Sequence, residues 1–157
     1  MKLLAYEVDK RSFLGVLNED ETWVYPVSAA GMEYRSMKEL IREAGQSGVG
    51  MADYISKKAP GDVMGAAPVD EIRVVSPIAE PDQDIICLGI NYMDHAEESA
   101  RFEKREFERP EKAIYFSKRV NRTNDPDGII PAHKNLTSQL DYEAELAVVI
   151  GKDADNV

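Results

Sequence analysis

Cysteine and histidine are both scarce in this sequence of 157 residues, which holds one cysteine and two histidines. A single cysteine excludes an internal disulfide and any metal cluster built on cysteine ligands. Cys87 lies in the apolar run 85–89, a setting typical of a buried thiol with a structural role.

Long hydrophobic runs and net positive charge are also absent. No run approaches the roughly 18 apolar residues of a transmembrane helix, and no signal peptide is visible at the N-terminus. The net charge of −10 and pI near 4.7 argue against nucleic acid or a membrane surface as a partner, because phosphate binding depends on accumulated lysine and arginine. We expect a cytoplasmic protein.

The composition, with 43% hydrophobic and 31% charged residues, is that of a globular protein. Apolar clusters at 2–8, 12–17 and 22–27 predict a small antiparallel meander. Ser36, with Glu39 three residues on, predicts a helix start, and Gly45 predicts its end. A second helix is predicted at Met51–Lys58. The Gly/Ala/Pro-rich stretch 61–68 predicts a linker, so we place a small N-terminal α+β domain at 1–68 and a second domain at 69–157.

The second domain reads as mostly β. The pattern predicts an edge strand at 72–77, a buried strand at 84–89, a short helix at 91–100 and a strand at 113–117. The sequence 124–128, Asn-Asp-Pro-Asp-Gly, predicts a turn in which Gly128 is free to take positive φ. The predicted fold class is α+β, mostly β.

Acidic and apolar residues alternate at the start of the stretch 140–151 and give way to an apolar run. A strand here would place Asp141, Glu143 and Glu145 on one face, with neighbouring carboxylates roughly 7 Å apart. Glu143 and Glu145 could then each give an oxygen to one hard cation such as Mg²⁺ or Ca²⁺. Spacing alone favours the alternative, a solvated strand face.

A histidine and a glutamate lie three residues apart in the predicted helix at 91–100. On a helix His95 and Glu98 would share a face, and a carboxylate beside an imidazole orients it and raises its pKa, which suits a proton-accepting histidine. A chance pair on a surface helix is the alternative. The other histidine, His133, lies in a predicted loop and receives no role.

Four motifs in order resemble the fumarylacetoacetate hydrolase family: Cys87–Glu98, Pro110–Lys118, Asp125–Pro131 and Leu140–Lys152. The resemblance implies a metal-dependent enzyme, commonly a homodimer, with Mg²⁺ or Mn²⁺ bound by Glu143 and Glu145. His95 and Glu98 match the family's dyad on a mobile lid helix. Lys118 matches a substrate-contacting lysine, and Asn91 stands near the substrate.

The same resemblance implies an incomplete family fold, a β-roll or barrel of which the chain carries the first half. The family's third metal carboxylate, an aspartate on a later strand, has no counterpart here. Three alternatives follow: a half that a complementing C-terminal chain completes, a non-catalytic binding or assembly module, or an unrelated acidic domain. The substrate expected is a small acidic keto compound, and the reaction is hydrolysis of a carbon–carbon bond, decarboxylation or isomerisation.

Overall fold

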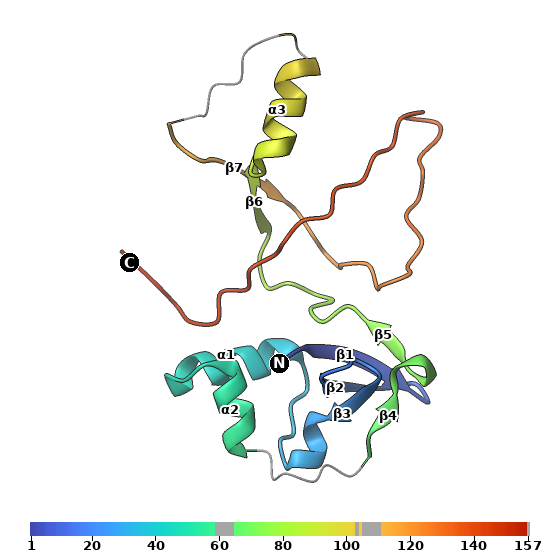
Figure 1. Cartoon of the computed structure of the whole chain (residues 1–157), viewed down its shortest axis with the longest axis vertical. Helices are drawn as coiled ribbons and strands as arrows, with labels where there is room; N and C mark the ends of the chain where they lie inside the picture. Colours follow the sequence, from blue (N-terminus) through green and yellow to red (C-terminus); the bar gives the residue numbers. More distant parts are fainter. Residues whose placement is uncertain (59–64, 103, 105–110, 157) are drawn as a thin grey trace. The chain divides into compact units, whose positions relative to one another are not determined.

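The computed structural model describes residues 1–58, 65–102, 104 and 111–156 (Figure 1). They fall into two compact units, residues 1–79 with 124–156 and Glu80–Thr123. Strands and helices both occur, and strands outnumber α-helices in the described ranges, so the predicted α+β, mostly β class is confirmed. Within those ranges, no helix is both long enough and apolar enough to cross a membrane.

A five-stranded antiparallel sheet organises the first unit, with strand order β4-β3-β2-β1-β5. Its strands are β1 (Leu3–Val8), β2 (Arg11–Leu17), β3 (Trp23–Pro26), β4 (Ala67–Pro68) and β5 (Arg73–Val75). Asp9 and Lys10 join β1 to β2 with φ of 49° and 64°, the conformation whose twist matches that of the flanking strands. The predicted meander is confirmed, and so is the predicted edge strand, because β5 lies at one edge of the sheet.

The predicted domain boundary lies between two strands of this sheet. β4 pairs with β3, and β5 pairs with β1, while the 3-10 helix η2 (Val69–Glu71) joins them. The predicted linker lies partly outside the described residues, which omit 59–64. The division into 1–68 and 69–157 stays a prediction.

Between β3 and β4 come the 3-10 helix η1 (Val27–Ala30) and the helices α1 (Met37–Ser47) and α2 (Met51–Lys58). The hydroxyl of Ser36 accepts a hydrogen bond from the amide of Glu39 at 3.3 Å, and the Glu39 carboxylate accepts one from the amide of Arg35 at 2.7 Å. These contacts satisfy amides that the first helical turn leaves unpaired. The predicted end at Gly45 is wrong, because Gly48 takes the left-handed cap with φ of 74° and Gly45 lies inside α1.

Apolar side chains of the helices form the larger core cluster of the first unit. Leu40 of α1 is fully buried, and the cluster also contains Val27, Met32, Met37, Ala44, Tyr54 and Ile55. A second cluster, Leu4, Tyr6 and Val24, lies within the sheet. Because α1 presents Met37, Leu40 and Ala44 at helical spacing, one face of the helix is buried and the other is exposed.

Two tyrosines and a glutamate tie the loop before α1 to both helices. The hydroxyls of Tyr34 and Tyr54 lie 2.7 Å apart, and both lie within hydrogen-bonding distance of the Glu43 carboxylate, at 3.0 and 2.9 Å. Partial burial, followed by the hydrogen bonds to Tyr54 and Glu43, raises the pKa of Tyr34 well above its ordinary value of 10.0.

The second unit contains the antiparallel strands β6 (Ile85–Gly89) and β7 (Ile114–Lys118) and the helix α3 (Met93–Phe102). These three elements confirm the predicted strand–helix–strand order. The prediction that the first strand is buried is wrong: Cys87 is 8% exposed, but Ile86 is 66% exposed. Among the described residues β6 pairs with β7 alone, and every residue of β7 is exposed, so the ladder lacks the packed layers that bury a strand on both faces.

The segment 124–156 follows and is mostly irregular (Figure 1). The predicted turn at 124–128 is confirmed, since the Gly128 amide donates to the Asp125 carbonyl at 2.9 Å. The positive φ belongs to Asp127, at 59°, and not to Gly128, because aspartate tolerates the left-handed conformation. The predicted strand at 140–151 is wrong: a strand needs a neighbouring strand to share its hydrogen bonds, and none of the strands in the described residues pairs with this stretch.

Candidate functional site

Strand β7 carries the candidate lysine of the second unit. Lys118 is paired with Ile85, and Phe116 is paired with Cys87. Because side chains alternate along a strand, Phe116 and Lys118 share one face, and the Lys118 Nζ atom lies 5.8 Å from the centroid of the Phe116 ring. This contact holds the ammonium group beside an aromatic surface, while Lys118 as a whole stays exposed and able to meet an anionic group.

A tight reversal connects β6 to the candidate helix. Ile90 has φ of 54°, an uncommon conformation for a β-branched residue. The exposed Asn91 follows it, and the first helical hydrogen bond runs from the Ala96 amide to the Tyr92 carbonyl at 3.0 Å. Asn91 therefore lies in the short connection, residues 90–92, between β6 and α3.

Helix α3 presents the candidate dyad to solvent. Ala96 and Ala100, four residues apart, are each 2% exposed, so small side chains form the buried face of the helix. His95 and Glu98 are exposed and lie three residues apart on the helix, as predicted. In the described part of the chain, no hydrogen bond or ion pair joins the two side chains.

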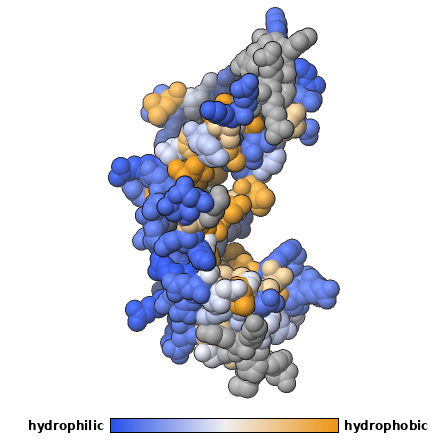
Figure 2. All heavy atoms as spheres, turned by 90° about the vertical axis from the view of Figure 1, so that its left-hand side faces the viewer, coloured by the Kyte–Doolittle hydropathy of each residue, from blue (hydrophilic) through white to orange (hydrophobic). Residues whose placement is uncertain are grey.

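Glu143 and Glu145 belong to the other unit, in the irregular stretch 140–150. Both carboxylates are exposed, and so are their apolar neighbours, among them Tyr142 at 85% and Leu146 at 84%. Figure 2 shows hydrophobic residues at the surface among hydrophilic ones. Exposed apolar residues in such numbers are unusual for a monomer that functions alone.

The chemistry of the acidic donors fits a hard cation, because carboxylate oxygens are the ligands that Mg²⁺, Mn²⁺ and Ca²⁺ prefer. Their number does not make a site: within the described ranges, no group of three or more His, Cys, Asp or Glu is placed to hold a metal ion. Glu143 and Glu145 alone leave most positions around such an ion to water or to other residues.

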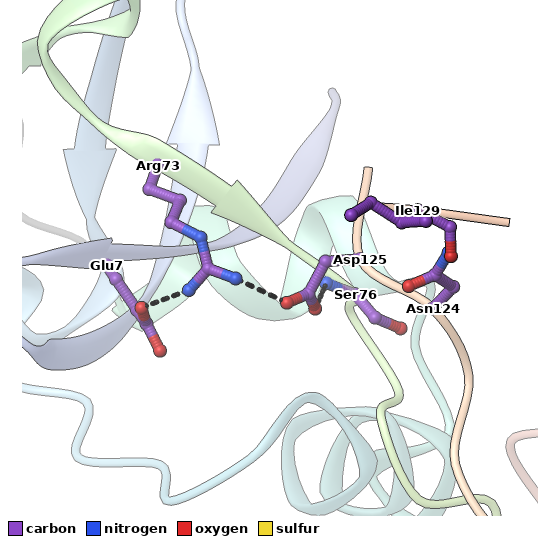
Figure 3. A network of polar contacts seen from close by, with 6 residues as sticks. All are labelled: Glu7, Arg73, Ser76, Asn124, Asp125 and Ile129. Atoms are coloured by element: carbon purple, nitrogen blue, oxygen red, sulfur yellow. Dashed lines mark hydrogen bonds and ion pairs between the residues drawn. The ribbon is translucent and has the colours of Figure 1, made fainter. Parts of the chain in front are cut away.

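Reasoning from the sequence missed an arginine that binds the turn at Asp125. The Arg73 guanidinium contacts the carboxylates of Glu7 and Asp125, both at 2.6 Å, and the second oxygen of Asp125 accepts from the amide of Ser76 at 2.9 Å (Figure 3). All these residues belong to the first unit. The only sequence signal was an arginine on a predicted edge strand, and many such arginines are merely solvated.

The family model for the fumarylacetoacetate (FAA) hydrolase C-terminal region matches residues 84–157. Oxaloacetate tautomerase YisK of Bacillus subtilis (strain 168) is 34% identical over 167 residues, covering 100% of this chain and 54% of that protein. An uncharacterized protein of Staphylococcus aureus (strain USA300) is 35% identical over 88 residues, covering 56% of this chain and 27% of its own.

Among solved structures, a fumarylacetoacetate hydrolase from the psychrophilic Exiguobacterium antarcticum matches with a TM-score of 0.54 and 27% identity. The match covers 91% of this chain and 44% of that one. The chain thus spans about half the length of the tautomerase and less than half of the solved hydrolase. Its fold is that of part of this larger architecture.

Proposed function

We propose, on the premise that this chain belongs to the fumarylacetoacetate hydrolase family, that it supplies part of the active site of an enzyme acting on a small acidic keto compound. The likeness to an oxaloacetate tautomerase along the whole chain carries the finer proposal. That proposal is proton transfer between the keto and enol forms of a 2-keto diacid.

Each candidate residue receives a role from its chemistry. His95 moves the proton between carbon and oxygen, and Glu98 orients the imidazole and stabilises its charged form. Lys118, with its exposed ammonium beside Phe116, binds a substrate carboxylate. Asn91, between β6 and α3, offers an amide to a substrate oxygen.

Glu143 and Glu145 would hold Mg²⁺ or Mn²⁺ together with ligands from outside the chain's described residues. When bound, such an ion acts as a Lewis acid on a carbonyl oxygen. We propose that a complementing segment supplies the remaining ligands and covers the exposed apolar stretch 140–150. This segment would belong to a second chain or would correspond to the part of the relatives that this chain does not span.

Single-residue variants of this chain, each combined with the complementing segment, test these roles. The rate of enol-to-keto conversion of oxaloacetate is followed by the loss of the enol's ultraviolet absorbance, and Mn²⁺ binding is measured by calorimetry. His95→Ala should slow conversion by about 10²- to 10⁴-fold, the usual contribution of a general acid–base, with Mn²⁺ affinity unchanged. Glu143→Gln and Glu145→Gln should instead weaken Mn²⁺ binding.

His133→Ala serves as the matched control, since His133 is the other histidine of the chain and has no assigned role. Equal rates in the His95 and His133 variants would remove His95 from the mechanism. Unchanged Mn²⁺ affinity in both glutamate variants would mean that Glu143 and Glu145 are solvated surface residues and not metal ligands.

A non-catalytic binding or assembly module is the second candidate. It is favoured by the absence, in the described residues, of any group of three potential metal ligands. In that case the assembly would form through the exposed apolar stretch 140–150 but show neither Mn²⁺ binding nor conversion of oxaloacetate.

A further inference from the structure

Helix α1 approaches the end of the carboxylate-bearing stretch without any side chain between the two backbones. A Cβ atom added to Gly45 would overlap the carbonyl oxygen of Gly151 and lie 2.7 Å from its carbonyl carbon. In the reverse direction, a Cβ on Gly151 would lie 3.4 Å from the Cγ2 atom of Ile41. The backbone of residue 151 therefore rests against the helix face formed by Ile41 and Gly45.

This contact gives a physical reason for a glycine inside α1. Glycine is less favourable than alanine in a helix interior because it loses more backbone freedom on folding. Gly48 and Gly50, by contrast, have nothing within 4 Å of an added Cβ. Of the glycines in and beside α1, Gly45 alone is therefore required by a packing contact.

A second contact holds the chain farther upstream. Asp125 binds the Arg73 guanidinium and the Ser76 amide (Figure 3), and its carbonyl closes the turn with Gly128. The Asp125 side chain is 21% exposed. The stretch with Glu143 and Glu145 thus lies between two attachment points on the N-terminal part of the same unit, β5 at one end and α1 at the other.

We propose that Gly45 and Arg73 are positioning residues for the carboxylate pair. The N-terminal sheet and α1 act as a platform that fixes both ends of the stretch 125–151, which reduces the conformations available to Glu143 and Glu145 before any metal or partner arrives. This inference rests on the proposed function in one respect, since it takes the two glutamates as metal ligands.

Nuclear magnetic resonance of the intact 17.5 kDa chain tests the contact directly. In the unmodified protein we expect nuclear Overhauser effects between the γ2-methyl group of Ile41 and the α-protons of Gly151. Gly45→Ala should remove them and lower the amide order parameter of Gly151 below about 0.6, the level of a flexible chain. Gly50→Ala is the matched control and should change neither.

A functional readout separates positioning from simple stability. Mn²⁺ is added, and the broadening of the amide signals of Glu143 and Glu145 gives an apparent affinity. Gly45→Ala and Arg73→Gln should each weaken it by about three- to tenfold through lost pre-organisation, while the amide signals of the sheet stay in place. Arg73→Gln also guards against misfolding of the Gly45 variant, because Arg73 is 60% exposed and its loss leaves the core intact.

The outcomes are distinguishable. The proposed platform is refuted if the unmodified chain shows no nuclear Overhauser effects between Ile41 and Gly151. It is also refuted if these nuclear Overhauser effects persist in Gly45→Ala. If those effects behave as expected but Glu143→Gln and Glu145→Gln leave Mn²⁺ broadening unchanged, the metal role of the glutamates fails while the platform stands. If the glutamate variants lose broadening and the Gly45 and Arg73 variants keep full affinity, the positioning role fails and the metal role stands.

Discussion

Replacing Leu40 by alanine tests whether the α1 core holds the first unit together. Leu40 is fully buried in the cluster with Met37, Ala44 and Ile55. The change removes three carbon groups, a loss of about 2.4 kcal/mol in transfer free energy at roughly 0.8 kcal/mol for each group. The cavity left behind raises the total to about 3–5 kcal/mol.

The free energy of unfolding is measured by urea titration with circular dichroism. With a slope of about 1–3 kcal/mol per molar urea for small proteins, the midpoint should fall by on the order of 2 M. Gln46→Ala, at an exposed position of the same helix, should change the free energy by less than about 0.5 kcal/mol. Leu40→Met, which nearly conserves volume, should cost under about 1.5 kcal/mol.

A midpoint in Leu40→Ala equal to that of Gln46→Ala would refute the reasoning, since it would mean that α1 packs differently from the cluster described. An equal loss in the alanine and methionine variants would also count against it. Such a result would show that the site is insensitive to cavity volume, which a close-packed core is not.

Two further predictions concern the same unit. Because the pKa of Tyr34 is raised in the folded state, the unfolded chain ionises first, so the stability that this group contributes is complete below pH 10 and falls as pH rises above it. The free energy of unfolding should fall by at most about 1.4 kcal/mol per pH unit, and by less with solvent screening. A free energy of unfolding that stays constant above pH 10, and that Tyr34→Phe does not alter, would contradict this. Gly15→Ala should lower the free energy of unfolding by about 1–3 kcal/mol, because an added Cβ would overlap Val24 and lie 2.9 Å from the Tyr6 ring. Urea unfolding measures this loss, with Gly50→Ala as the control. A gain in stability would show that the sheet relaxes freely around the added methyl group.

Local features of the fold could be predicted because the residues that decide them are close in the sequence. Ser36 and Glu39 cap α1 through contacts within four residues, and the hairpin at Asp9 and Lys10 depends on two dihedral angles. Such signals do not depend on the rest of the chain, so the positions of the meander and of the helices could be predicted from the sequence.

Features that depend on distant partners could not be predicted. Gly45 resembles a helix terminator in the sequence, but the reason for a glycine there is the backbone of Gly151, far along the chain. The same holds for Arg73, whose partner Asp125 lies in a turn that the sequence located without indicating what it binds. Which residue of this turn takes positive φ could not be predicted either, since aspartate and glycine both tolerate that conformation and Asp127 adopts it.

The stretch 140–151 shows why a correct pattern can fail to give the predicted structure. Alternating polar and apolar residues favour a strand only where another strand accepts the hydrogen bonds and an apolar layer covers one face. In the described residues neither is supplied, and Val148 and Ile150 are 79% and 77% exposed. Alternation in the sequence is therefore not enough to make this stretch a strand.

The proposed function would link metal binding to pairing with the complementing segment. If a complementing segment pairs with 140–151, it orders Glu143 and Glu145 on one face of a strand and brings the remaining ligands with it. An ion that binds the paired state more tightly than the unpaired one must then stabilise the pairing by the same factor that pairing strengthens its binding. The platform of Gly45 and Arg73 acts before either event, because fixing the two ends of the stretch lowers the conformational entropy that both would otherwise have to overcome. The N-terminal part of the first unit, residues 1–79, thus gains a role in the proposed chemistry without contributing a ligand.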